Sequence, residues 1–120
     1  MSRDKSADKR YEMEQNIRYK EQAIDELSQE KYHFEQELEN FQAHTHQSFQ
    51  RTSGLYEKMA RSGNSQGERE LSVEYEVERA LRQMVERQYE EVEAYYRNKK
   101  NQLEEEIEQL YNERNALPWD

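Results

Sequence analysis

The sequence contains no cysteine, one proline, one tryptophan and three glycines among 120 residues. The absence of cysteine excludes disulfides and thiolate chemistry. The scarcity of proline and glycine leaves long stretches with nothing to interrupt a helix. No run approaches the roughly 18 apolar residues of a membrane span, and the first residues lack the apolar segment of a signal peptide. We therefore expect no membrane insertion.

What the sequence does contain is charge. Charged residues make up 38% of the chain and hydrophobic residues 32%, nine of them tyrosines. This balance approaches that of disordered proteins, but uninterrupted Glu, Gln, Lys, Arg and Leu are typical of long helices. The net charge of −9 argues against nucleic acid as a partner, because binding phosphates requires Lys and Arg concentrated on one face.

The stretch RSGNSQGERE, residues 61–70, combines two of the three glycines with small polar residues. Gly63 suits the left-handed residue that ends a helix. The segment from Ser65 through Gly67 to Glu68 is typical of a capping box, in which the serine hydroxyl accepts the amide of Glu68 and Glu68 reaches back to the cap amide. The stretch therefore predicts a short turn between two helices.

Short connections between helices give antiparallel neighbours. We predict an all-α fold, a long antiparallel two-helix hairpin with coiled-coil-like packing, as a single domain over residues 1–120. The expected elements are a helix from about 8 to 60, a turn over about 61–65 and a helix from about 66 to 117.

The apolar spacing predicts the face along which the helices meet. Residues recur by threes, fours and sevens, as in a heptad seam, with one slip after Phe41. In the first helix these residues are Met13, Ile17, Ile24, Leu27, Phe34, Leu38 and Phe41, then Phe49, Thr52, Tyr56 and Met59; in the second they are Val85, Tyr89, Val92, Tyr96, Leu103, Ile107, Leu110 and Leu117. A hairpin folded near Asn64 places Leu103 near Leu27 and Tyr89 near 39–41, to within about one helical turn.

Gly54 is discordant, since a glycine inside a helix costs about 1 kcal/mol against alanine. It marks a kink, a frayed segment, a close backbone approach or an ordinary tolerated glycine, and the sequence does not choose among them.

No pattern indicates catalysis. His44 and His46 are two residues apart and point to opposite sides of a helix, whereas helical metal ligands need spacings of three or four. His33 lies more than a turn away. The many carboxylates lack the shielded pocket that general acid–base catalysis requires. We therefore expect no enzyme, no metal and no cofactor.

The remaining feature is apolar surface. A two-helix hairpin leaves much of each seam exposed and buries too little to offset chain entropy, so we expect a partner chain to complete a bundle. Tyr95 and Tyr96 are adjacent, so one of them should face outward. The tyrosines either bind the partner or widen the intramolecular seam. The candidate partner-binding residues are Phe34, Leu38, Phe41, Phe49, Tyr56, Tyr89, Val92, Tyr96 and Trp119.

The segment NALPWD, residues 115–120, places the one proline and the one tryptophan together. Pro118 should end the second helix. In a hairpin this segment lies beside the start of the first helix, near Tyr11 and Met13, where Trp119 either caps the open end of the seam or anchors a partner.

In its hairpin layout, its hydrophilic Glu-, Gln- and Tyr-rich composition and its closing LYNERNALPW, the chain resembles the WXG-like small helical partners of LXG toxins in type VIIb secretion systems of Gram-positive bacteria. The central Trp-x-Gly is missing, because the turn reads SGNSQG. The Phe-x-x-x-Asp motif of one kind of these partners is also missing, so the resemblance is to the other kind.

This resemblance implies an adaptor or targeting chaperone that binds the helical N-terminal LXG region of a toxin, beside a second small helical partner, and promotes its export. It implies a cytoplasmic protein and leaves open whether the protein leaves the cell with its client. The alternative is a structural coiled-coil scaffold that only self-associates, for example as a homodimer.

Overall fold

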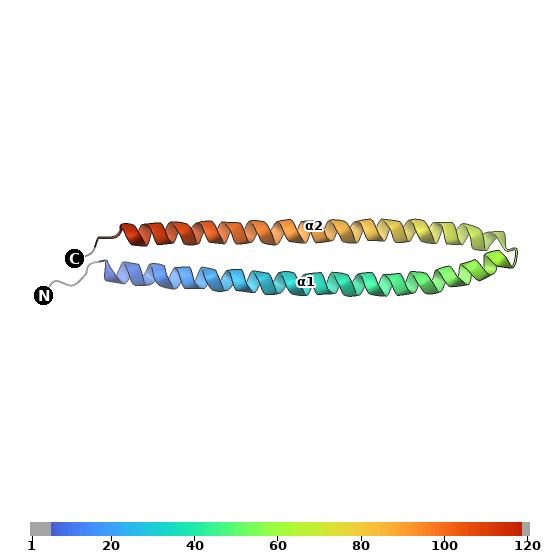
Figure 1. Cartoon of the computed structure of the whole chain (residues 1–120), viewed down its shortest axis with the longest axis horizontal. Helices are drawn as coiled ribbons and strands as arrows, with labels where there is room; N and C mark the ends of the chain where they lie inside the picture. The colour runs from blue at the N-terminus through green and yellow to red at the C-terminus, as the bar shows by residue number, and fades with distance from the viewer. Residues whose placement is uncertain (1–5, 119–120) are drawn as a thin grey trace. The chain divides into compact units, whose positions relative to one another are not determined.

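The computed structural model describes residues 6–118, which form two helices packed antiparallel (Figure 1). Helix α1 spans Ala7–Arg61 and helix α2 spans Ser65–Ala116. The predicted all-α, antiparallel two-helix fold is therefore confirmed. Each helix end lies one residue from its expected position.

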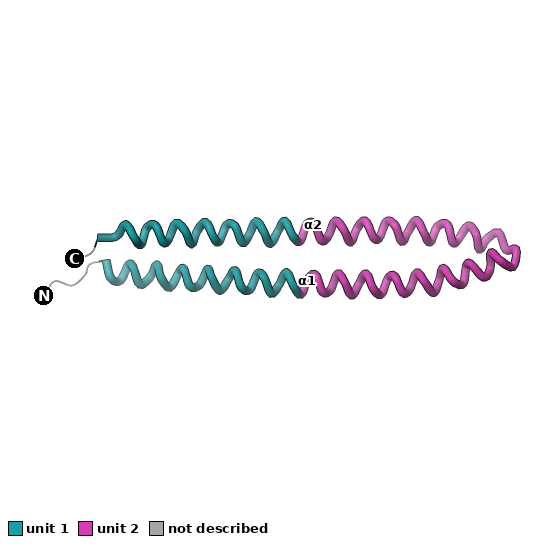
Figure 2. Tube along the Cα trace, viewed as in Figure 1, with its two compact units in different colours: residues 1–32, 93–120 teal, residues 33–92 magenta. Residues whose placement is uncertain are grey.

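The chain divides into two compact units (Figure 2). Unit 1 comprises Met1–Tyr32 and Glu93–Asp120, and unit 2 comprises His33–Val92. Each unit thus contains a segment of α1 packed against a segment of α2.

The turn between the helices is closed by a Schellman motif. The amide of Gly63 donates to the carbonyl of Ala60 at 3.0 Å, and the amide of Asn64 donates to the carbonyl of Met59 at 3.0 Å. Gly63 has a φ of 86°, the left-handed conformation that a residue with a Cβ rarely adopts. The motif satisfies two carbonyls that the end of α1 leaves without helical partners.

The cap of α2 is Asn64, and the predicted capping box at Ser65 is wrong. The Oδ1 atom of Asn64 accepts the amide of Gln66 at 3.0 Å, and its carbonyl accepts the amide of Gly67. Ser65 is already the first residue of α2. The turn is one residue tighter than the serine pattern predicts, because Asn64 serves both as the last residue of the Schellman motif and as the cap.

Gly67 and Gly54 have different surroundings. A Cβ added to Gly67 would stand 2.8 Å from the Cβ of Met59 and 3.0 Å from the carbonyl oxygen of Tyr56. The first turn of α2 can therefore lie against the last turn of α1 only because residue 67 has no side chain. Gly54 has no such neighbour within 4 Å and lies inside α1, so the close-approach explanation for Gly54 is excluded.

The face along which the helices pack contains few fully buried apolar side chains. Among the described residues they are Ile17 in unit 1 and Val85 and Val92 in unit 2, with exposed fractions of 3%, 4% and 8%. All three belong to the predicted seam. Most other seam residues of α2 are half-buried, because a helix with only one neighbour cannot surround them.

The predicted seam is wrong at Phe34 and Phe41. Both are exposed, at 43% and 47%, whereas Lys31, Glu35 and Leu38 are half-buried. The slip in the heptad pattern therefore falls before Leu38 rather than after Phe41. A four-residue step inserted there turns the aromatic positions out of the seam.

The predicted register is correct to within one helical turn. Glu14 contacts Arg114 and Lys31 contacts Glu93 in unit 1. In unit 2 the hydroxyl of Tyr89 donates to the carbonyl of Glu35, at 3.4 Å. Leu27 and Leu103 line one shallow depression, as the hairpin register requires.

Candidate protein-binding surface

Charged pairs join the two helices of unit 1. Lys20 Nζ lies 2.7 Å from Glu106 Oε2, and Lys31 pairs with Glu93. A hydrogen bond from each lysine, supported by its charge, holds the pKa of the partner carboxyl below its ordinary value of 4.5. Such partly exposed pairs contribute little net stability but favour one register over others.

Unit 1 also holds the end of the described chain. The Nη1 atom of Arg10 donates to the carbonyl of Pro118 at 3.2 Å, and the Arg10 side chain is buried. The C-terminal segment therefore reaches the start of α1, as expected for a hairpin. Trp119, for which a cap and an anchor are both predicted, lies outside the described residues.

The large apolar side chains that unit 1 exposes are all tyrosines, among the described residues. Tyr95 faces outward with 54% exposure, and its ring meets Tyr96 edge-on with centroids 5.1 Å apart. This confirms the prediction that the adjacent tyrosines cannot share a face. Lys99 lies over the Tyr95 ring and Arg114 over that of Tyr111, so these rings already have cationic neighbours.

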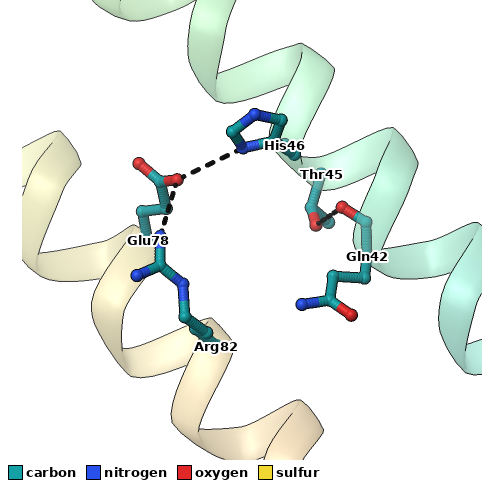
Figure 3. Close-up of polar contacts among 5 residues, drawn as sticks. All are labelled: Gln42, Thr45, His46, Glu78 and Arg82. Carbon is teal, nitrogen blue, oxygen red and sulfur yellow. Dashed lines mark hydrogen bonds and ion pairs between the residues drawn. The ribbon is translucent and has the colours of Figure 1, made fainter.

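Unit 2 has one polar side, shown in Figure 3. The Glu78 carboxylate lies between His46 Nδ1, at 3.6 Å, and Arg82 Nη2, at 3.2 Å. The hydroxyl of Tyr75 donates to Glu57 on the other helix at 3.4 Å. A depression of about 270 Å³ lies beside this group, with Phe49 and Val85 in its lining. The polar groups that meet across this side of unit 2 are thus matched to one another.

The other side of unit 2 carries six exposed apolar side chains. On α1, Phe41 follows Phe34 by seven residues and Leu55 follows Phe41 by fourteen, so all three share one helix face. On α2, Met84 follows Val77 by seven residues, and Val73 precedes Val77 by four. All six side chains are between 43% and 58% exposed. We call Phe34, Phe41, Leu55, Val73, Val77 and Met84 the apolar face.

These six residues lie on one side of the helix pair. Leu55 and Met84 each come directly before a residue of the seam, Tyr56 and Val85. In an antiparallel pair, the positions that precede the first seam residue of each heptad lie on the same side. His46 and Arg82 occupy the heptad position on the opposite side of the seam from the apolar face. Both contact Glu78 on that opposite side of the helix pair.

Among the nine predicted partner-binding residues, Phe34 and Phe41 belong to the apolar face. Val92 is buried, and the half-buried ones are Leu38, Phe49, Tyr56, Tyr89 and Tyr96. Burial is the main cause that raises the pKa of Tyr89 and of Tyr96 above 10.0, with Glu39 and Glu30 as their respective carboxylate neighbours. The partner-binding role of all nine stays a prediction.

The sequence patterns missed Leu55, Val73, Val77 and Met84. Leu55 and Met84 each stand one position before a predicted seam residue, and Met84 follows Val77 by seven residues. Placing Phe34 and Phe41 in the seam leaves Leu55 without companions on its face, and this hides the signal.

The described residues contain no group of three or more His, Asp or Glu side chains that could hold a metal ion. Over residues 6–118, neither helix contains a stretch of the length and apolar character needed to cross a membrane.

No protein-family model, curated protein or solved structure matches the chain.

Proposed function

We propose that this protein is a non-enzymatic adaptor that binds a helical region of another protein through the apolar face of unit 2. The observation that carries the proposal is the alignment of six exposed apolar side chains on one side of an antiparallel helix pair. Exposed apolar side chains gathered on one face are typical of interaction sites. Helical ligands that insert a stripe of apolar residues are a recurring partner for such faces.

The thin core supports the same proposal. Only three apolar side chains of the described residues are buried, and twelve large hydrophobic side chains of the same residues are exposed in the isolated chain. A partner helix laid along unit 2 would turn two helices into a bundle and bury that surface. Because these side chains are already about half covered, each one so buried stabilises the complex by about half of the roughly 1.5–3 kcal/mol that full burial provides, before ordering costs.

We propose the helical LXG region of a type VII secreted toxin as the client, with export of the toxin as the outcome. This part of the proposal rests on the resemblance of the chain to the small helical partners of such toxins. A second small helical protein can join the same complex. The alternative function is a homo-oligomeric scaffold, which the exposed face also favours, because two copies can cover one another.

Co-expression tests these proposals. A tagged copy of the chain is produced with the LXG region of a toxin encoded beside it, purified, and measured by size-exclusion chromatography with light scattering. We expect a stable complex of the two proteins. Recovery of the chain as a monomer beside unbound LXG region would contradict the toxin proposal, and a homodimer that excludes the LXG region would support the scaffold.

A substitution on the apolar face locates the contact. Met84→Glu places a charge on the face, whereas Gln83→Glu places the same charge one residue away and turned from it. We expect Met84→Glu to abolish the complex and Gln83→Glu to leave it intact. Circular dichroism of both free variants checks that the helices are retained.

A further inference from the structure

The apolar face occupies two positions of the heptad. One is the position before the first seam residue, and the other, taken by Val73, comes three residues after it. In unit 2 these two positions also hold three acidic and three basic residues, all of them exposed except the half-buried Glu70. The six are Glu37, Arg51, Lys58, Glu70, Arg87 and Glu91. With His44, the one histidine there, uncharged, the two positions carry no net charge.

The end of the face nearer the turn has an excess of positive charge. Arg51 and Lys58 on α1 share this end with Glu70 on α2. Their proximity follows from the close approach of Gly67 to Met59, which sets the register of the two helices at this end. Two cations and one carboxylate leave one unbalanced positive charge there.

The end of the face farther from the turn has the opposite excess. Glu37 on α1 lies level with Arg87 and Glu91 on α2, because the hydroxyl of Tyr89 donates to the carbonyl of Glu35. Here two carboxylates and one cation leave one unbalanced negative charge. Between the two ends, the positions of the face hold no Asp, Glu, Lys or Arg. The face therefore has an uncharged centre and two ends of opposite sign.

We propose that a second copy of this chain covers the apolar face before a client binds, docked head to tail about a two-fold axis perpendicular to the helices. In this docking α1 lies against α1 of the second copy and α2 against its α2, each pair antiparallel. The negative end of each face then meets the positive end of the other, so both excess charges are neutralised. Docking with both turns at the same end would bring like ends together, which opposes association.

The apolar side chains are spaced symmetrically about the same axis. Phe34 and Leu55 are the first and last apolar residues of the face on α1, so reversing α1 about their midpoint exchanges them. The register of the hairpin places that midpoint level with the one between Val77 and Met84 on α2. Head-to-tail docking therefore sets Phe34 against Leu55 of the second copy. The same axis sets Val77 against Met84, so one axis fits both helices.

The face is large enough for a stable dimer. From Phe34 to Lys58 it is about 36 Å long at about 1.5 Å per residue, and two helices of about 10 Å each make it about 20 Å wide. Covering it on both copies buries about 1,400 Å² in total, within the range of about 1,200–2,000 Å² that specific interfaces bury. The product is a four-helix bundle in which each unit 2 gains a second layer.

This inference goes beyond the proposed function, because it concerns the chain before it meets a client. The second copy and a client helix compete for the same face. Self-association thus keeps the exposed apolar side chains out of water until a client replaces the second copy, and client binding then requires the dimer to separate.

A cysteine introduced beside the axis tests the docking. Ala80 occupies a position of the face between Val77 and Met84, so head-to-tail docking sets it opposite Ala80 of the second copy. With both turns at the same end it would lie opposite α1 instead. Because the chain contains no cysteine, Ala80→Cys adds a single thiol, and we expect mild oxidation to link the full chains into dimers. Gln83→Cys, turned from the face, should link far more slowly, and equal linking of the two variants would overturn the docking.

Charge exchange gives an independent test. Head-to-tail docking sets Glu37 against Arg51 of the second copy, so Arg51→Glu places two carboxylates together and should weaken the dimer about tenfold. The double variant Glu37→Arg/Arg51→Glu exchanges the signs and should restore it. Arg79→Glu, away from the face, should leave the dimer unchanged. Sedimentation equilibrium at about pH 8, where histidine is uncharged, measures all four chains, and circular dichroism checks that each is helical.

Two results would overturn the inference. One is a wild-type chain that stays monomeric at about 100 µM, a concentration at which even a Kd of about 10 µM gives mostly dimer. The other is a dimer that the double variant weakens further than Arg51→Glu alone, since that outcome means the two charges do not face one another.

The outcomes also separate this inference from the proposed client. A monomeric chain that binds the LXG region overturns the inference and leaves the proposed function intact. A dimer linked through Ala80→Cys, with no binding of the LXG region after reduction, leaves the inference intact and contradicts the client. If the client uses the same face, the linked dimer should not bind the LXG region and the reduced protein should.

Discussion

Gly67 of α2 lies so close to Met59 of α1 that a Cβ on Gly67 would stand 2.8 Å from the Cβ of Met59 and 2.8 Å from the amide nitrogen of Ala60. One of these neighbours is backbone and cannot rotate away. We expect Gly67→Ala to destabilise the protein by about 1–3 kcal/mol through overpacking, measured by urea unfolding. This loss should exceed the gain of up to about 1 kcal/mol from alanine's helix propensity.

Gly54→Ala provides the matched comparison. Apart from its chain neighbours and its own helix backbone, Gly54 has nothing within 4 Å of a built Cβ, and it lies inside α1. The substitution should stabilise the protein by about 0.5–1 kcal/mol. Opposite signs for the two glycines are the expected result in the same urea series. A loss at Gly54 equal to that at Gly67 would contradict the close-contact explanation.

The cap of α2 gives a second pair of variants. Asn64→Ala removes the side-chain oxygen that accepts the amide of Gln66 and should cost about 1 kcal/mol. Ser65→Ala should change the free energy of unfolding by less than about 0.5 kcal/mol, because residue 65 already lies inside the helix. Thermal denaturation of both variants checks the prediction. A larger loss of stability in Ser65→Ala than in Asn64→Ala would support Ser65 as the cap instead.

The Lys20–Glu106 pair should make stability depend on pH. The folded-state pKa of Glu106 lies below 4.5, so the pair's contribution is fully present above pH 4.5 and is lost as the pH falls through the folded value. In Lys20→Gln the pKa of Glu106 should rise towards 4.5, followed by NMR titration of the side-chain carboxyl. The stability difference between wild type and variant should vanish in acid.

Lys100→Gln is the control for the loss of one positive charge. Lys100 contacts Glu104 at 3.9 Å within α2 and joins no second helix through that contact. The Lys100→Gln substitution should leave the pKa of Glu106 at its wild-type value. An equal rise of that pKa in both variants would assign the shift to net charge rather than to Lys20.

Two valines eight residues apart test where the core lies. Val85 is 4% exposed and Val77 45%. Val85→Ala should cost about 2 kcal/mol, from lost burial and the cavity left behind. Val77→Ala should be within about 0.5 kcal/mol of wild type in the free protein, and should weaken the proposed complex. Urea unfolding of the free chain and co-purification with the LXG region measure the two effects.

The sequence by itself determined the helices, the site of the turn and the antiparallel fold. These features depend on local chemistry: few interrupting residues, a heptad spacing, and Gly63 in a segment of small polar residues. The register followed to within a helical turn, because a short connection fixes which residues can lie opposite one another. Val85 and Val92 could be placed in the seam because the spacing from Val85 to Tyr96 follows the heptad without a slip.

Only the tertiary structure decided which aromatic residues face outward. A single four-residue step between Leu27 and Leu38 rotates Phe34 and Phe41 out of the seam, and heptad spacing in one helix does not fix where such a step falls. The packing of the second helix fixes it. The same packing selected Asn64 over Ser65 as the cap and made Gly67 a contact residue. The apolar face becomes visible only once both helices are placed together, because half of its residues come from each.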